Sequence, residues 1–174
     1  MNPPRRTGHD GPYGAPFRTD WRTVPADWLD YNGHMNVAYY TMAFDQAIDD
    51  MLHAELGIGE SHVVASRQGP YALQASLQYL DEMLEGDDYQ ISVQMIDCDE
   101  KRMHLYLELR KSPDQLAATC EELLMNVDLE TRRSAPYPNW AARRINQMMS
   151  DHCTALHRPA SLGQPIGIRR KSMS

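Results

Sequence analysis

A carboxylate, a glycine, an imidazole and an amide lie within one short stretch of this chain, at Asp30, Gly33, His34 and Asn36. An apolar pattern with helical spacing follows directly from Val37. The first N–H groups of a helix have no partner within it, and they lie at the positive end of the helix dipole. Such groups can stabilise the negative oxygen that forms when a carbonyl is attacked. The stretch therefore predicts an acyl-transfer site in which a thioester or ester is the substrate.

Each of these four residues has a separate expected role. Asp30 either attacks the carbonyl or activates water, and its alternative is a turn residue that only bonds backbone N–H groups. Gly33 is expected to adopt a backbone conformation that a side chain would resist. His34 either holds the loop and orients the carboxylate or simply packs on the helix. Asn36 is expected to cap the helix.

The pattern Asp-x-x-Gly-His-x-Asn at residues 30–36, followed by Tyr40 and by Phe44-Asp45-Gln46-Ala47, resembles the 4-hydroxybenzoyl-CoA thioesterase family of the hotdog fold. The chain departs from the family pattern at Met35, at Val37 and at Asp45, where valine, asparagine and glutamate are usual. The resemblance covers roughly residues 17–138. It implies an acyl-CoA thioesterase in which the backbone N–H of Val37 binds the thioester carbonyl.

The resemblance also implies a homodimer or homotetramer whose active sites lie where two subunits meet. The segment Asp-Tyr-Asn-Gly-His-Met at residues 30–35 is similar to the corresponding segment of thioesterases found beside carnitine and betaine breakdown enzymes. This similarity suggests betainyl-CoA as a substrate. Aromatic rings and carboxylates can bind a quaternary ammonium group, although rings near a helix start more often belong to the core. The candidate substrate-binding residues are Tyr31, Tyr40, Asp45 and Tyr71, with Trp28, Tyr39 and Asp49 as further candidates for such a pocket.

The elements that must position this site are one helix and a series of strands. After the Asn36 cap, apolar residues recur every three or four positions until Gly57, which predicts one long amphipathic helix. Downstream the period changes to two, which predicts strands at about 71–79, 89–95, 103–109 and 123–129 with the odd-numbered residues inward. Residues 17–23 alternate in the same way and predict a first strand. The simplest joint arrangement is an α+β domain in which an antiparallel meander wraps the helix, and the resemblance identifies it as a hotdog fold.

The two ends of the chain have a different composition. Residues 1–16 are rich in Pro, Gly, Arg and Asp, and we expect a flexible arm. Asn139 and Trp140 are expected to open a helix that ends near Met149 and completes a single domain over 17–150. A tail, 151–174, follows and contains the basic run at 169–171.

Composition limits the classes of function. The 174 residues contain 17 Lys and Arg against 24 Asp and Glu, a net charge of −7, which disfavours nucleic-acid binding. No apolar stretch approaches the ~18 residues of a membrane span, and the N-terminus has no apolar region like that of a secretory signal. Three scattered cysteines fit a reducing compartment. We therefore expect a cytoplasmic protein that does not bind membranes.

We expect no metal and no cofactor, since coenzyme A is part of the substrate. The spacing of Asp45, Asp49 and His53 could suit a metal, but no further ligands accompany it. The CoA phosphates need positive charge, and the sequence leaves three clusters open: Lys101-Arg102, Arg110-Lys111 and Arg132-Arg133. Two other functions also stay open, a non-catalytic acyl-CoA-binding sensor and a hotdog hydratase or dehydratase.

Overall fold

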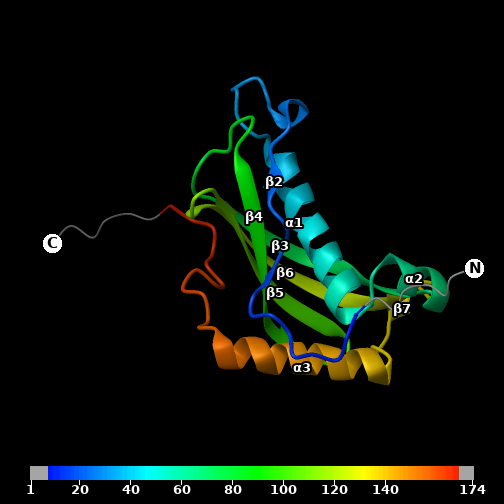
Figure 1. Ribbon diagram of the computed structural model, residues 1–174. Helices are drawn as coiled ribbons and strands as arrows, with labels where there is room; N and C mark the ends of the chain where they lie inside the picture. Colours follow the sequence, from blue (N-terminus) through cyan, green and yellow to red (C-terminus); the bar gives the residue numbers. More distant parts are fainter. Residues whose placement is uncertain (1–7, 169–174) are drawn as a thin grey trace, which may run out of the picture.

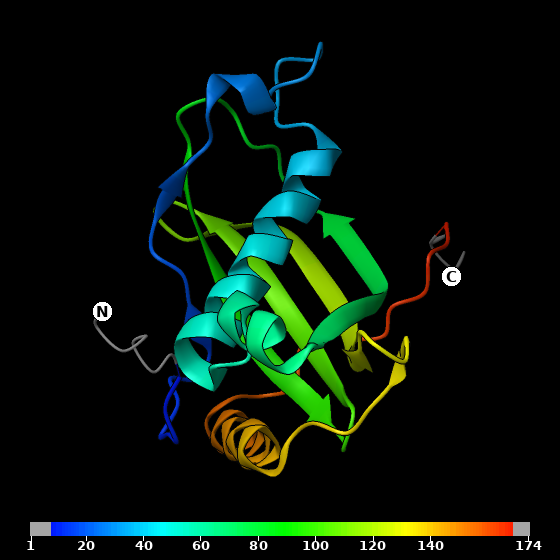
Figure 2. The ribbon, with the colours of Figure 1, turned by 90° about the vertical axis from the view of Figure 1, so that its right-hand side faces the viewer.

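A single antiparallel sheet lies against one long helix in the computed structural model, which describes residues 8–168. Within these residues the seven strands follow the order β1-β4-β5-β6-β3, with β2 paired to β4 and β7 to β6. Figures 1 and 2 show helix α1 lying across one face of the sheet and helix α3 along one end of it. The strands are β1 (Phe17–Arg18), β2 (Arg22–Thr23), β3 (Gln68–Tyr79), β4 (Asp88–Cys98), β5 (Arg102–Lys111), β6 (Gln115–Asp128) and β7 (Arg133–Ser134). The predicted α+β fold with an antiparallel sheet around one helix is confirmed. The meander holds only for β4, β5 and β6, because β3 pairs with β6 rather than with β4, so the connection from β3 to β4 is a crossover and not the expected hairpin-like turn.

Helix α1 (Val37–Met51) starts at the predicted cap and continues as a π-helical turn, Leu52–Leu56. Gly57 ends it with a φ of 72°, a left-handed conformation that favours glycine. The predicted stripe is the buried one, because residues spaced by three and four share a face. Its buried members are Tyr40, Ala43, Phe44, Ala47, Ile48 and Met51.

Three other helical segments complete the fold. A 3₁₀ turn, Ala26–Trp28, precedes the Asp30 loop, and a short helix α2 (Glu60–Ser66), which the sequence pattern did not predict, joins α1 to β3. Helix α3 (Asn139–Ala155) extends beyond the expected end near Met149. The added turn continues the buried face of α3, with His152 as its last buried residue. No helix of the described residues is both long and apolar enough to span a membrane.

Strands β4 and β5 bury their odd-numbered residues, as the sequence predicts. Strand β6 is different in two respects: it begins at Gln115, well before the predicted start at Leu123, and from Cys120 onward its even-numbered residues are the buried ones. Apolar side chains occupy both odd- and even-numbered positions of β6, so the alternation does not decide which face of the strand is buried. The buried residues of β6 are Ala117, Ala118, Thr119, Cys120, Glu122, Leu124 and Asn126.

Two pairing irregularities alter the predicted strands. In β3 the register shifts between Ala72 and Gln74, so that Leu73 is an extra residue. The predicted first strand divides into β1 and β2, which pair with Val93–Ser92 and Tyr89–Asp88 of β4. The chain has one more residue between these two pairs than β4 has, and this interrupts the ladder.

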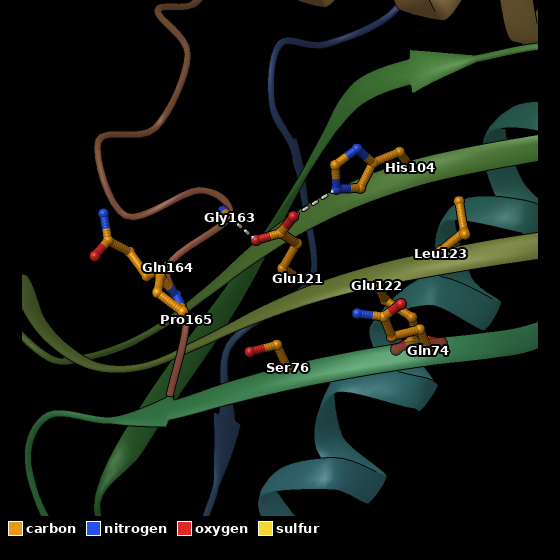
Figure 3. Close-up of a pocket in the computed structure, with 9 residues that line it drawn as sticks. All are labelled: Gln74, Ser76, His104, Glu121, Glu122, Leu123, Gly163, Gln164 and Pro165. Atoms are coloured by element: carbon orange, nitrogen blue, oxygen red, sulfur yellow. Dashed lines mark hydrogen bonds and ion pairs between the residues drawn. The ribbon is translucent and has the colours of Figure 1, made fainter. Parts of the chain in front are cut away.

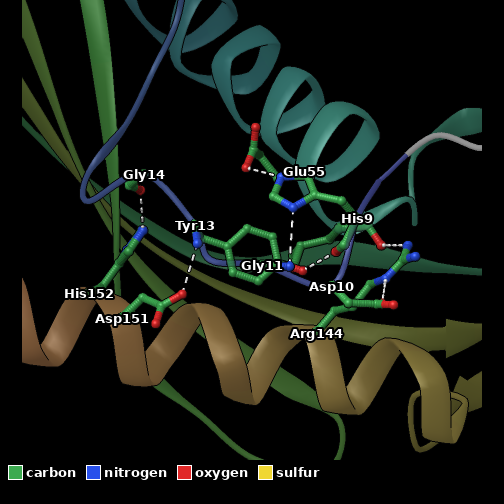
Figure 4. A network of polar contacts seen from close by, with 10 residues as sticks. His9, Asp10, Gly11, Tyr13, Gly14, Glu55, Arg144, Asp151 and His152 are labelled. Carbon is green, nitrogen blue, oxygen red and sulfur yellow. Dashed lines mark hydrogen bonds and ion pairs between the residues drawn. The ribbon is translucent and has the colours of Figure 1, made fainter.

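The part of the N-terminal arm that is described, residues 8–16, is packed against the domain rather than loosely attached (Figure 4). Tyr13 is buried, and its N–H donates to Asp151 of α3 at 2.8 Å. The imidazole of His152 donates from Nε2 to the Gly14 carbonyl at 2.9 Å and accepts the Met95 N–H at Nδ1 at 2.8 Å. These contacts tie the arm to α3 and β4. Residues 1–7 and the basic run at 169–171 lie outside the described residues.

Candidate active site

The Asp30 loop is a small hairpin closed by backbone hydrogen bonds. Leu29 and Met35 form an isolated antiparallel bridge, and the Asp30 N–H donates to the His34 carbonyl at 3.0 Å. Gly33 turns the chain with a φ of 80°, and its N–H donates to the Asp30 carbonyl at 3.0 Å. A Cβ at Gly33 would meet nothing within 4 Å, so the backbone conformation is what requires glycine there.

The Asp30 carboxylate is half-buried and has one fixed oxygen. Its Oδ1 accepts the Asn32 N–H at 2.8 Å. No donor in the described chain is recorded for the second oxygen, so it can engage a substrate or a water molecule. The turn role and a chemical role are therefore compatible in this one side chain.

The loop is anchored on both sides. The Met35 N–H donates to the Met83 carbonyl at 2.8 Å, and the Asn36 N–H donates to the Trp28 carbonyl at 2.9 Å. Trp28 also stacks on Tyr39 of α1, with ring centroids 5.2 Å apart and planes 7° from parallel. Figures 1 and 2 show this loop at the same end of the molecule as the connection between β3 and β4. Asp30 is therefore held by a rigid support at the start of α1.

The N-terminus of α1 keeps one free donor. The Asn36 side chain accepts the Ala38 N–H at 2.9 Å, and the Asn36 carbonyl accepts the Tyr39 N–H at 3.0 Å. Within residues 8–168 the N–H of Val37 has no recorded acceptor, and Val37 is 58 % exposed. An accessible N–H at the positive end of a helix is suited to bind a carbonyl oxygen that gains negative charge.

A pocket of about 320 Å³ adjoins this donor. It brings together His34, Val37 and Tyr40 from the predicted set. The hydroxyl of Tyr40 makes a long hydrogen bond of 3.5 Å to the Asp81 carbonyl, and burial raises the pKa of this tyrosine. The tyrosine is therefore a neutral wall of the pocket at physiological pH.

The other wall of the pocket comes from residues that sequence reasoning missed. These are Tyr79, Leu80, Asp81 and Glu82, at the end of β3 and just beyond it. Lys111 fixes this segment, because its Nζ lies 2.5 Å from the Asp81 carboxylate and donates to the Glu82 carbonyl at 3.0 Å. The hydrogen bond from Lys111 lowers the pKa of Asp81, so this carboxylate stays ionised. No local sequence signal indicates that the end of β3 returns to the start of α1.

The remaining predicted substrate residues do not line this pocket. Tyr31 is 97 % exposed, Tyr71 is 46 % exposed on β3, and Asp45 and Asp49 lie exposed on α1. Within one chain the rings of Trp28, Tyr31 and Tyr71 are therefore not assembled into a box. The part of the chain that the structure covers also has no cluster of three or more His, Cys, Asp or Glu side chains that could hold a metal ion.

The three basic clusters differ in how far their charges are already paired. Asp99 binds Arg102 through two nitrogens at 2.8 and 2.6 Å, and Lys101 lies 3.5 Å from Glu100. In the second cluster, Arg110 pairs with Glu108 and Asp114, and Lys111 pairs with Asp81. Arg132 and Arg133 are exposed, and no ion pair is recorded for either within residues 8–168.

A second pocket, of about 360 Å³, lies on the face of the sheet that points away from α1 (Figure 3). Glu121 is its central charged group: it accepts the Gly163 N–H at 2.7 Å and lies 2.8 Å from Nε2 of His104. No helix N-terminus and no residue of the Asp30 loop lines this pocket. It therefore lacks the groups that an acyl-transfer reaction needs.

Comparison with known proteins identifies the family of this chain. Residues 24–145 match the family model of the thioesterase-like superfamily. A betainyl-CoA thioesterase of Pseudomonas aeruginosa is 32 % identical over 146 residues, which cover 83 % of this chain and 91 % of that protein.

Two solved structures have the same fold. A protein of Staphylococcus aureus, determined in complex with CoA, has a TM-score of 0.82 and 27 % identity over 88 % of this chain and 96 % of the other. A protein of Pseudomonas putida described as a thioesterase has a TM-score of 0.75 and 28 % identity over 89 % and 98 %. The predicted hotdog fold is confirmed by these matches.

Proposed function

This chain belongs to the thioesterase-like superfamily, and we propose that the substrate it hydrolyses is betainyl-CoA. The chain is an acyl-CoA thioesterase, and the products of the proposed reaction are betaine and CoA. The observation that carries the proposal is the free N–H of Val37 beside the Asp30 loop. Thioester hydrolysis needs a donor that stabilises the carbonyl oxygen and a carboxylate that attacks the carbonyl or activates water, and these two groups match those needs. The similarity to a betainyl-CoA thioesterase supports the choice of acyl group.

The proposed reaction uses Asp30 in one of two ways. As a nucleophile, its carboxylate oxygen bonds to the acyl carbon, the C–S bond breaks, and water then hydrolyses the resulting anhydride. As a general base, Asp30 takes a proton from a water molecule whose oxygen bonds to the acyl carbon, and the C–S bond breaks in the same way. In both routes the N–H of Val37 stabilises the carbonyl oxygen, and the departing CoA thiolate takes up a proton.

The other predicted residues support this chemistry indirectly. Gly33 and the backbone carbonyl of His34 hold Asp30 in place, and His34 lines the pocket. Asn36 directs the first turn of α1 by capping it. The proposed reaction needs no resident cofactor or metal, because CoA enters as part of the substrate. Its proposed compartment is the cytoplasm, where CoA thioesters are available.

For the assembly we propose a homodimer formed through β3. This strand is at the edge of the sheet, and its twelve residues contain no charged side chain. Natural proteins usually protect such edges with charges or prolines; β3 has one proline, Pro70 near its start, and no charge along the rest of the strand, which favours pairing with a second chain. Tyr71 and Leu73, which are 46 % and 50 % exposed, would be covered by that pairing. Further association to a tetramer is compatible with the same edge contact.

For the CoA nucleotide we propose Arg132 and Arg133. A guanidinium group that is free of carboxylate partners can bind phosphate through two parallel hydrogen bonds. The other two clusters are held by ion pairs within the chain.

The test of the function is release of free CoA thiol from a panel of acyl-CoA substrates. We expect betainyl-CoA to have the highest kcat/KM, above acetyl-CoA and 4-hydroxybenzoyl-CoA. Hydrolysis of neutral or aromatic thioesters at equal or higher kcat/KM would refute the proposed acyl group. Absence of hydrolysis with every thioester would refute catalysis itself.

A further inference from the structure

Tyr79 places an aromatic ring beside the pocket that adjoins the Val37 N–H. It is the last residue of β3 and pairs with the buried Ala118 of β6. Its ring meets the ring of Tyr40 on α1 edge to face, with centroids 5.2 Å apart and planes at 79°. Tyr40 is 4 % exposed, whereas Tyr79 is 49 % exposed. The buried ring of Tyr40 therefore supports the ring of Tyr79, which keeps an accessible surface.

The ring of Tyr79 is neutral and is not tied down through its hydroxyl. Burial raises the pKa of this tyrosine, and no hydrogen bond is recorded for its hydroxyl within residues 8–168. The face of a neutral aromatic ring carries partial negative charge, and it attracts a cation that lies within about 6 Å of its centroid. A quaternary ammonium group donates no hydrogen bonds, so an aromatic ring suits it better than a carbonyl or a hydroxyl group.

The same pocket has more negative than positive charge. Asp81 and Glu82 both line it, and His34 is the only basic residue of the described chain that does. Lys111 pairs with the Asp81 carboxylate at 2.5 Å, but it donates to the backbone carbonyl of Glu82. Glu82 is exposed, and no ion pair is recorded for its carboxylate in the part of the chain that the structure describes. One lysine thus compensates Asp81, and the charge of Glu82 remains.

The short acyl group of the proposed substrate can reach this ring. In betainyl-CoA a single CH₂ group separates the carbonyl carbon from the quaternary nitrogen, so the cation stays close to the carbonyl. Val37 and Tyr79 line one pocket of about 320 Å³. A carbonyl oxygen bound at the Val37 N–H therefore leaves the cation inside this pocket, at the wall that contains Tyr79 and Glu82. A neutral group of the same shape makes the same apolar contacts there, but it gains no attraction to the ring face or the carboxylate.

We propose that Tyr79 determines the acyl-group specificity: its ring binds the quaternary ammonium group of the substrate, and Glu82 adds a negative charge that a neutral acyl group cannot use. This inference rests on the proposed function, since it assigns the residues that recognise the acyl group of that substrate. Tyr79 and Glu82 act on specificity and take no part in breaking the C–S bond. Tyr31 and Tyr71, which the sequence suggested for this role, do not line the pocket.

The test compares two substrates of the same shape and different charge. In 3,3-dimethylbutanoyl-CoA a carbon atom replaces the quaternary nitrogen of betainyl-CoA, so the ratio of the two kcat/KM values measures recognition of charge alone. We expect Tyr79→Leu to lower this ratio by about ten-fold, because it removes a ring that binds the cation. Tyr79→Phe keeps the ring and should keep most of the wild-type ratio.

Glu82→Gln provides a second measurement at an exposed position. It should lower the ratio by about three-fold, a smaller change because water screens an exposed charge. Glu85→Gln is the matched control, because Glu85 is an exposed carboxylate of the same connection between β3 and β4 and does not line the pocket. It should leave the ratio unaltered.

The inference is wrong if either Tyr79→Leu or Glu82→Gln folds and keeps the wild-type ratio, or slows both substrates equally. A ratio that falls as far in Tyr79→Phe as in Tyr79→Leu also refutes it, since the ring would then not be the cause. If Tyr79→Leu does not fold, the comparison of Glu82→Gln with Glu85→Gln decides in the same way. A wild-type enzyme that hydrolyses the neutral substrate equally well refutes instead the proposed acyl group.

Discussion

The side-chain oxygen of Asn36 accepts the N–H of Ala38 at 2.9 Å and not the N–H of Val37, which lies between them in the chain. The N–H of Val37 is thereby left without a recorded acceptor in the described chain, at the positive end of α1. A structural cap and the proposed catalytic donor are thus consecutive parts of one helix start. The loop that ends in this cap also carries Asp30.

Asp30→Asn should abolish most of the activity without unfolding the protein. The amide cannot act as nucleophile or base, so we expect kcat to fall by about 10²-fold or more. Thiol release from an acyl-CoA measures this, with circular dichroism to check the fold. Asp27→Asn is the control, because Asp27 is an exposed carboxylate in the preceding 3₁₀ turn. Near wild-type turnover in a folded Asp30→Asn variant would exclude the mechanism.

Asn36→Ala should destabilise the first turn of α1. Removal of the cap leaves the Ala38 N–H without its partner, and we expect the free energy of unfolding to drop by about 1 kcal/mol. Urea denaturation at fixed protein concentration measures the change. Asn36→Asp keeps an oxygen acceptor at the same place and should retain most of the stability. Equal losses in both variants would mean that the cap is not the cause.

Arg132→Glu combined with Arg133→Glu should raise KM for acyl-CoA by about ten-fold, because the phosphates lose two positive partners. KM for the matching acyl-pantetheine, which has no nucleotide, should change little. Arg143→Glu is a suitable control, as it alters an exposed arginine of α3. A parallel rise in KM for both substrates would argue against a nucleotide site.

Stability should decrease at mildly acidic pH because of His152. Burial lowers the pKa of this histidine below its usual 6.5, and its Nδ1 must stay unprotonated to accept the Met95 N–H. The unfolded chain therefore binds a proton more readily, and the free energy of unfolding falls as pH drops below 6.5 toward the folded-state pKa. The slope is at most about 1.4 kcal/mol per pH unit for one proton.

The measurement is urea denaturation between pH 7.5 and 5.5 at one protein concentration. His152→Gln should be less stable at neutral pH and should show a smaller decrease over this range. His157→Gln, at an exposed position, should behave like the wild type. An identical pH dependence in His152→Gln and the wild type would contradict the assignment.

Leu73→Lys should weaken self-association. It places a charge on an edge strand that has none, which disfavours pairing with a second chain. Light scattering at micromolar concentration should find a dimer or larger assembly for the wild type and a larger monomer fraction for the variant. Val64→Lys, at a 71 % exposed position on α2, should remain associated. A monomeric wild type would refute the proposed assembly.

The sequence alone determined the features that depend on local chemistry. The spacing of apolar residues predicted α1, and the alternation in β4 and β5 predicted their buried faces. Gly33 and Gly57 adopt the left-handed conformations that few other residues tolerate, and Asn36 caps the helix. These outcomes depend on interactions within a few residues, so a single sequence contains them.

Tertiary structure decided which distant segments meet and which side of β6 is buried. Both odd- and even-numbered positions are apolar at Leu123, Leu124 and Met125, so the sequence does not decide which side of β6 is buried. Only pairing with β3 and β5 directs Glu122 inward. Likewise the end of β3 reaches the start of α1 because the Met35 N–H binds the Met83 carbonyl. Hydrogen bonds between segments far apart in the chain fix these positions, and local periodicity carries no information about such long-range pairing.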